Sequence, residues 1–444
     1  MGAINIKHTG SGAAIALSSD GTSLLLDGTA VGGGADLYAA NESSPTAQPS
    51  ATGANAIAIG DSAVASGPNA LVGPFSKGSG DFSFSAAGGN SQAWGATGYG
   101  AVAIGAGTNA RASSSVALGQ SAYTETGTQS VAIGDSYASG SHSLSAAIST
   151  NNSSYGATGA NSIAIGYQSR ATGSKAFSHN GGLASGTNSA ALFDSRAEAV
   201  GDYCIALGNA DARGSSSVSI NSSNSGFASG NSCFSFGSGA QAGSTSYLSY
   251  SSCIAMGYEA RAISGDHAIA LGFRARARRT NAVAIGERAL SDQDGKNSYS
   301  SGAFGSIYGS AQSAKYVLRS DTGDATAEAL TTNNSTAGAY NQIVLPNNSV
   351  YGFTGTVIAR EDSSSTNDFA VWEVKGGAVR AGSASTTALG SYNINKISES
   401  TGAANWSIAL SADTTNGAVA ITVTGEASHN IRWVATINTT EVIY

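Results

Sequence analysis

A five-residue phrase of alternating branched and small side chains returns about every fourteen residues through the middle of the chain. Residues 162–166 give its typical form, Ser-Ile-Ala-Ile-Gly. An alternation with a period of two predicts a short β-strand with one buried face. A fixed short period predicts one structural unit that is stacked many times. We therefore expect an all-β chain whose central part is a β-solenoid.

The phrase ends on glycine, which predicts a turn with positive φ or a close approach between two backbones. In-register positions hold Asn180, Asp194 and Asn221, which also tolerate left-handed geometry. The expected turn glycines are Gly60, Gly105, Gly119, Gly134, Gly166, Gly208, Gly257, Gly272 and Gly286.

A weaker alternation built on alanine lies between the phrases, as in residues 63–67 and 210–214. One repeat is therefore a strand, a turn, a second strand and a second turn, with a branched strand facing a small-residue strand. We expect the branched side chains to be buried in a thin core. The flat small-residue surface is then expected to pack against another copy of the chain, which predicts a homo-oligomer.

Three cysteines stand in one slot of the repeat, just before the first branched residue. They are Cys204, Cys233 and Cys253, at a position that otherwise holds Ser or Ala. This register predicts small buried thiols that fill serine-sized spaces. Pairing between chains about a symmetry axis is the alternative. Three scattered cysteines do not indicate a disulfide framework.

Composition limits the functional classes. The 444 residues include 59 glycines, only 11% are charged, and the net charge is −7. This balance argues against a nucleic-acid partner and a basic membrane-binding surface. No run of eighteen apolar residues occurs, and the N-terminus lacks a basic segment followed by an apolar core. We expect no membrane insertion and no signal peptide.

Changes in pattern divide the chain into five parts. Residues 1–35 predict a small N-terminal β module for attachment, and 36–52 a linker. Residues 53–290 hold the repeats, and 291–314 form a neck where the period is lost. Residues 315–444 contain long alternating runs and three of the four tryptophans, which predicts an independent β-sandwich that either binds a receptor or locks the trimer.

The phrase at 161–166 and its fellows resembles the head repeat of YadA-like trimeric adhesins. The resemblance implies a left-handed parallel β-roll in which three chains pack about one axis. The chain departs from the bacterial autotransporters of that family because it shows no export signal and no heptad stalk. Its last strands also lack an outward apolar belt.

The segments 341–346, 410–417 and 430–436 resemble the C-terminal module of bacteriophage tail-fibre proteins. The resemblance implies a trimeric fibre or related virion appendage. The N-terminal module would then bind a baseplate, tail or capsid protein, and the far end a host surface glycan or outer-membrane protein. The alternatives are a fragment of a bacterial trimeric adhesin and a polysaccharide-degrading tailspike.

Candidate chemistry is sparse. We expect no enzymatic activity, metal or cofactor, because the histidines are scattered and no paired carboxylates for glycan cleavage can be located. The candidate receptor contacts are Tyr351, Phe353, Trp372, Trp406 and Trp433, for which core packing is the alternative. An arginine cluster closes the repeats, made of Arg261, Arg274, Arg276, Arg278, Arg279 and Arg288. We interpret it as interchain ion pairs, with anionic glycan or lipopolysaccharide phosphate as the alternative.

Overall fold

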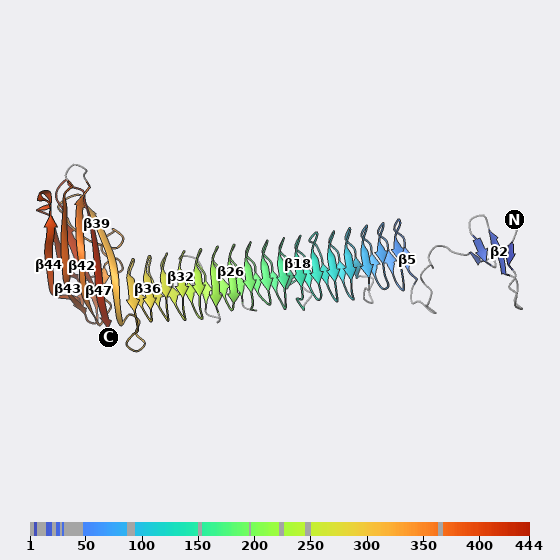
Figure 1. Ribbon diagram of the computed structural model, residues 1–444, viewed down its shortest axis with the longest axis horizontal. Coiled ribbons are helices and arrows are strands. Elements are labelled where there is room, and N and C mark those ends of the chain that lie inside the picture. The colour runs from blue at the N-terminus through green and yellow to red at the C-terminus, as the bar shows by residue number, and fades with distance from the viewer. Residues whose placement is uncertain are drawn as a thin grey trace. The chain divides into compact units, whose positions relative to one another are not determined.

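The computed structural model describes residues 48–86, 94–149, 153–194, 197–221, 226–244, 250–362 and 367–444, together with short strands before residue 31. The chain is all-β, with a β-solenoid of about 16 turns of ~14-residue repeats and a C-terminal antiparallel sheet region (Figure 1). It divides into two compact units, Met1–Lys175 and Ala176–Tyr444.

The N-terminal strands form an antiparallel sheet in the order β1-β2-β3-β4. These strands are β1 (Ile4–Ile6), β2 (Ile15–Ser19), β3 (Leu24–Leu26) and β4 (Thr29–Ala30). Residues 31–47, which include most of the expected linker, lie outside the described residues.

In the first unit, each solenoid turn contributes one strand to each of two parallel ladders. The repeat phrases pair in register, for example Val116 with Val131 and Leu118 with Ile133. The phrase strands are β6 (Ile57–Ala58), β8 (Leu71–Val72), β10 (Phe84–Ala86), β12 (Val102–Ile104), β14 (Val116–Leu118), β16 (Val131–Ile133), β18 (Leu144–Ala146) and β20 (Ile163–Ile165). The small-residue strands are β5 (Ser50–Ala51), β7 (Val64–Ala65), β9 (Lys77–Gly78), β11 (Gly95–Ala96), β13 (Asn109–Ala110), β15 (Tyr123–Thr124), β17 (Tyr137–Ala138), β19 (Gly156–Ala157) and β21 (Arg170–Ala171).

The second unit contains the same kind of turn. Its parallel ladder extends past residue 290 to β38, which pairs in register with β36. The phrase strands are β22 (Phe177–His179), β24 (Ala190–Leu192), β26 (Ile205–Gly208), β28 (Val218–Asn221), β30 (Phe234–Phe236), β32 (Ile254–Met256), β34 (Ile269–Leu271), β36 (Val283–Gly286) and β38 (Asn297–Ser300). The small-residue strands are β23 (Leu183–Ala184), β25 (Glu198–Ala199), β27 (Asp211–Ala212), β29 (Phe227–Ala228), β31 (Gln241–Ala242), β33 (Arg261–Ala262), β35 (Arg276–Ala277) and β37 (Leu290–Ser291).

The predicted orientation of the phrase strands was wrong. The central alanine points into the turn and is fully buried, as Ala132 and Ala164 are in the first unit. The branched neighbours point outward, and Ile133 and Ile163 keep 43% and 38% of their surface exposed. The side chains buried between the two ladders of a turn are mostly small, with methyl, hydroxyl or thiol groups, and larger ones such as Val72 and Ile148 are exceptions. The small residues therefore form the core of the solenoid, and the branched residues form its surface.

The slot before each phrase is also interior. Ser130 Oγ donates a hydrogen bond to the Gly127 carbonyl at 2.8 Å, and Ser162 Oγ to the Gly159 carbonyl at 2.7 Å. These bonds satisfy polar groups inside the turn. The three cysteines occupy this slot and are buried within the turns of one chain. Burial raises the pKa of Cys204 to about 11, the behaviour expected of an inert structural thiol.

Two antiparallel sheets make up the C-terminal region of the second unit. The larger continues from β38 in the order β39-β47-β42-β43-β44. Its strands are β39 (Ala311–Thr322), β47 (Ile431–Ile443), β42 (Ser349–Glu361), β43 (Phe369–Arg380) and β44 (Ala388–Glu399). In the smaller, β46 (Ala418–Thr424) pairs with β40 (Ala327–Ala329), β41 (Ile343–Val344) and β45 (Ser407–Asp413). Short 3-10 turns are η1 (Ala384–Thr386) and η2 (Thr401–Ala403).

Side chains from both sheets form one hydrophobic core. Tyr316 and Trp433 contribute from the larger sheet, and Ile421 and Val423 from the smaller. The alternation of side chains along the strands explains why only one face of the larger sheet joins this core. The residues of β39, for example, alternate between exposed and buried over its whole length. One face of the larger sheet therefore covers the core, and its other face is left on the surface.

Candidate functional site

A single row of polar residues crosses the outer face of the larger C-terminal sheet. Strand register aligns Asn297 of β38 with Lys315 of β39, and Lys315 with Asn438 of β47. It then aligns Asn438 with Thr354 of β42, and Thr354 with Lys375 of β43. Side chains at every second position of a strand point to the same face of the sheet. The register therefore brings the amide, amine and hydroxyl groups of residues from distant parts of the chain side by side.

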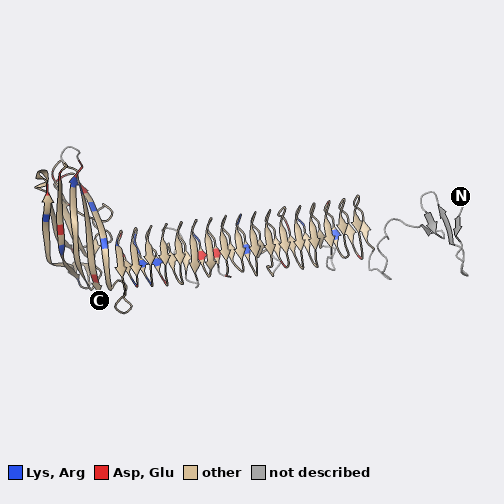
Figure 2. Cartoon of the chain, in the orientation of Figure 1, with Lys and Arg blue, Asp and Glu red and all other residues tan. Residues whose placement is uncertain are grey.

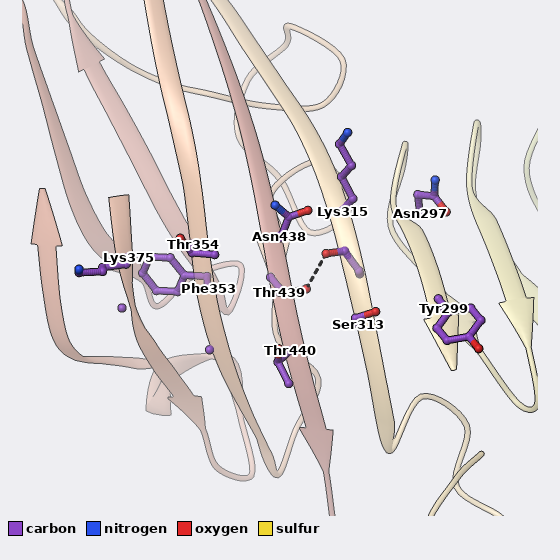
Figure 3. A pocket seen from close by; sticks show the side chains of 13 residues that line it. Asn297, Tyr299, Ser313, Lys315, Phe353, Thr354, Lys375, Asn438, Thr439 and Thr440 are labelled. Carbon is purple, nitrogen blue, oxygen red and sulfur yellow. Dashed lines mark hydrogen bonds between the residues drawn. The ribbon is translucent and has the colours of Figure 1, made fainter. Parts of the chain in front are cut away.

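This row lies in a surface hollow of about 750 Å³ (Figure 3). The floor is low at Gly352, which has no side chain; a Cβ added there would meet nothing within 4 Å. Behind the row, Thr439 Oγ1 donates to the Ala314 carbonyl at 3.4 Å. The lining comprises Asn297, Tyr299, Ser313, Ala314, Lys315, Gly352, Phe353, Thr354, Lys375, Gly376, Asn438, Thr439 and Thr440.

The hollow carries positive charge on a chain of net charge −7. Lys315 and Lys375 are exposed and project from β39 and β43, as the labelled side chains in Figure 3 show. No Asp or Glu belongs to the lining. Among the ion pairs of the described residues, neither lysine has a carboxylate partner. Outside the hollow, both basic and acidic residues mark the strands of the sheet in Figure 2, and Glu373 stands two residues before Lys375 on β43.

A buried polar network lies behind the sheet. Lys296 Nζ contacts Glu441 Oε2 at 2.8 Å, and Gln312 Nε2 donates to the same oxygen at 2.6 Å. Tyr316 Oη donates to Gln293 Oε1 at 2.6 Å. Burial, followed by the nearby charge of Glu441, raises the pKa of Tyr316 well above its ordinary value. This phenol therefore stays protonated, and the network holds the last solenoid turn against β39 and β47.

The five aromatic residues predicted as receptor contacts lie in the core. The exposed fraction is 0% for Tyr351 and Trp433 and at most 4% for the others. The Trp433 ring lies 5.6 Å from that of Trp372 and 6.0 Å from that of Trp406. Trp433 Nε1 also donates to Thr322 Oγ1 at 2.9 Å. We assign these side chains to packing, the alternative that the sequence left open; Phe353 alone reaches the hollow, as part of its wall.

Four of the six arginines of the cluster have partners within their own chain. Arg274 Nε pairs with Glu259 Oε2 at 2.7 Å, and Arg288 Nη1 with Glu287 Oε1 at 3.1 Å. Arg261 lies next to Arg276 in the parallel ladder, and Arg278 is exposed.

Aromatic rings are the partners that sequence reasoning missed. The Arg276 guanidinium lies 3.5 Å from the centre of the Tyr308 ring, and that of Arg279 lies 3.3 Å from the centre of the Tyr340 ring. Stacking on these rings fixes both guanidinium groups within the chain, which favours a structural role for Arg276 and Arg279. Pairing across chains stays a prediction.

The nine turn glycines all have positive φ, from 69° at Gly208 to 126° at Gly272. A second left-handed position lies in each turn just before the phrase. It is held mostly by residues other than glycine, such as Asn161 and Asn281, both with φ of 57°, although Gly100 holds it in one turn. Sequence reasoning missed this position because many residue types occupy it.

Within the described ranges, no group of three or more His, Cys, Asp and Glu residues is placed to hold a metal ion. Over the same residues, no helix has the length and apolar character needed to cross a membrane.

Comparisons with known proteins identify the repeats. The family model described as "YadA head domain repeat (2 copies)" matches residues 51–71, 96–122, 157–177 and 264–289. No curated protein matches the chain. A solved structure with similarity is the tailspike protein of Acinetobacter phage vB_ApiP_P1, at 12% sequence identity and a TM-score of 0.20. The alignment covers 84% of this chain and 76% of that chain. The matched repeats identify a YadA-like head-repeat β-roll.

Proposed function

We propose that this YadA-like head-repeat protein is a non-enzymatic structural subunit of a homotrimeric adhesive fibre. The observation that carries the proposal is the outward apolar face of the phrase strands. Its exposed members recur in many turns at the two outward slots of the phrase, just before and just after the central small residue. They are Ile57, Leu71, Ile104, Ile133 and Ile163 in the first unit, and Phe177, Ile205, Phe236, Met256 and Ile285 in the second.

Outward apolar side chains that lie in register on neighbouring turns, as Val116, Val131 and Leu144 do, form an apolar strip within each unit. Soluble proteins seldom leave such a strip uncovered, because burying apolar surface is worth about 25 cal/mol per Å². A second copy of the same chain offers a matching strip with the same spacing. YadA head domains are typically trimeric, which supports three chains over two.

The virion setting rests on the resemblance of the C-terminal segments to tail-fibre modules. The order of parts along the chain agrees with it, with a small N-terminal β module, stacked turns and a distal antiparallel region. In this proposal the N-terminal module binds a baseplate, tail or capsid protein, and the protein is exposed on the particle surface. Adhesion to a host glycan or outer-membrane protein would then be non-catalytic, with three copies adding avidity.

Light scattering tests the assembly. The full chain should give three times the monomer mass of 43.7 kDa. Replacing Ile133 and Ile163 together by Asp places two carboxylates on the apolar strip and should weaken or abolish the trimer. Thr172→Asp changes an exposed residue beyond the other ladder and should leave the mass unchanged. A wild-type monomer would contradict the proposal.

Adsorption to host cells tests the proposed location of the protein on a virion. The purified protein should compete with the intact particle for host cells, without releasing reducing ends from surface polysaccharide. Release of oligosaccharides would instead favour the tailspike alternative. A chromosomal locus next to secretion genes would favour the bacterial adhesin.

A further inference from the structure

We propose that the hollow on the outer face of the larger C-terminal sheet binds an acidic saccharide. This inference rests on the proposed adhesive function and names the ligand class for it. The ligand would be a sugar chain that carries carboxylate or phosphate groups.

The chemistry of the row argues for an anion. Lys315 and Lys375 stand on the first and last strands of the series β39-β47-β42-β43. Three strand spacings separate them, roughly 14 Å at the usual interval. Both ammonium groups lack a carboxylate partner among the described ion pairs, and no acidic side chain lines the hollow. Two separate cations of this kind suit a chain with repeated negative charges better than one small ion.

The groups between the lysines argue for a saccharide. Asn438 and Thr354 lie between them in the row, and Ser313 and Thr440 lie one row away. Amides and hydroxyls both donate and accept hydrogen bonds, which matches the hydroxyl-rich edge of a sugar. Tyr299 contributes an exposed ring at the β38 end, where a sugar ring can stack.

The shape of the hollow agrees with this ligand. Its volume of about 750 Å³ lies in the ordinary range of ligand sites. Backbone at Gly352 forms the floor, so a sugar chain can approach the sheet closely. A lining free of carboxylates supports binding without cleavage at this place.

Binding to defined oligosaccharides tests the inference. The probes are fluorescent oligogalacturonate, phosphorylated mannan oligosaccharide and neutral dextran of matched length. The full-length protein should bind one or both charged probes, with affinity that falls as salt rises, and should not bind dextran. Binding of oligogalacturonate alone would identify carboxylates as the recognised group, and binding of the mannan alone would identify phosphates.

Two variants address the site directly. Lys315→Gln combined with Lys375→Gln should lower the affinity about tenfold or more, because the charge-assisted hydrogen bonds are lost. Gly352→Asp should have an effect of similar size, since it places a carboxylate between the lysines. The added side chain enters open space, so the fold should tolerate it. Lys175→Gln removes one exposed charge elsewhere and should change the affinity less than about twofold.

Several outcomes would overturn the inference. These are equal binding of charged and neutral probes, no binding of any probe, and full binding by the variants. Protection of Lys315 and Lys375 from amine-reactive labels in the assembled protein would show that a second copy covers this face. Light scattering on the same samples separates the two proposals. A trimer without saccharide binding removes only this site, whereas a monomer removes the proposed assembly.

Discussion

Lys296 Nζ lies 2.8 Å from Glu441 Oε2, and both side chains are almost completely shielded from solvent. Lys296 stands just before β38, in the last solenoid turn, and Glu441 stands near the end of β47, 145 residues later. A second carboxylate, Asp292, lies 3.8 Å from the same ammonium. The ion pair therefore joins the last solenoid turn to the C-terminal sheet. Burial of either charged group without the other would be costly.

Breaking this pair from one side should be costly. Lys296→Met leaves the Glu441 carboxylate buried without its cation, which typically lowers the free energy of unfolding by about 3–5 kcal/mol. Combining Lys296→Met with Glu441→Leu should recover part of that loss, because no uncompensated charge remains. Denaturant unfolding followed by the fluorescence of Trp372, Trp406 and Trp433 measures both effects.

The exposed pair between Lys396 and Glu399 provides the control. Glu399→Gln should lower the free energy of unfolding by less than about 1 kcal/mol, as for other solvated pairs. Equal losses for Lys296→Met and Glu399→Gln would show that the buried pair does not stabilise the junction.

A second prediction concerns a ladder of glycines in the first unit. A Cβ on Gly159 would lie 2.0 Å from the Gly173 carbonyl oxygen, and one on Gly140 would lie 1.9 Å from that of Gly159. Both contacts are with backbone, so Gly159→Ala must force two turns apart. We expect a loss of more than about 3 kcal/mol in the free energy of unfolding, in the upper range for single substitutions.

Gly134 is the matched comparison. It has φ of 71°, but an added Cβ would meet nothing within 4 Å. Gly134→Ala should lose only the cost of left-handed geometry, about 1–2 kcal/mol. Thermal unfolding by circular dichroism ranks the two variants, and a larger loss for Gly134→Ala would contradict the role of close stacking.

The repeat and its strands could be predicted from the sequence, because one pattern returns many times in register. The direction of the side chains could not. The phrase around Ile163 and Ala164 has two alternating faces, and hydrophobicity alone assigned the branched residues to the inside. The space between the two ladders is narrow, so the small residues occupy the inside and the branched residues the surface. The width of this space depends on how whole turns pack, and no single phrase of the sequence encodes it.

The hollow could not be predicted for a different reason. Lys315, Lys375 and Asn438 stand far apart in the chain and meet only through antiparallel register. Each alternating run indicates a strand but not its neighbour. The aromatic residues attracted attention because such side chains often bind ligands, yet Trp433 and Trp372 face the core. Polar outward residues further along the same strands, Asn438 and Lys375, belong to the candidate site.

The reversed orientation yields a third prediction. Ala164 is fully buried inside its turn, so Ala164→Leu adds three carbon atoms where no space exists. Overpacking of this kind typically costs about 1–3 kcal/mol. Ile163→Leu, at the neighbouring outward position, keeps a similar apolar volume and should cost less than about 1.5 kcal/mol. Thermal unfolding of both variants measures the difference, and a greater loss for Ile163→Leu would contradict the orientation.

The turn between β45 and β46 should make stability depend on acid pH. Asp413 Oδ1 accepts hydrogen bonds from the Thr415 and Asn416 amides at 3.0 and 2.9 Å. Its Oδ2 accepts from Asn416 Nδ2 at 2.7 Å and from Gln342 Nε2 at 2.8 Å. Burial works against the charged form, but these hydrogen bonds outweigh it and hold the pKa of Asp413 below its ordinary value of 3.8.

A depressed pKa in the folded state fixes the sign of this pH dependence. The carboxylate of Asp413 contributes its full stability above the ordinary pKa, and that contribution is lost as the pH falls through the folded-state pKa. Asp413→Asn should therefore flatten the decline in the free energy of unfolding from about pH 5 to about pH 2. Gln342→Leu removes one donor and should move the carboxyl pKa, followed by NMR titration, back toward 3.8. An unchanged decline in Asp413→Asn, together with an unmoved pKa in Gln342→Leu, would mean that the turn is held by its backbone bonds alone.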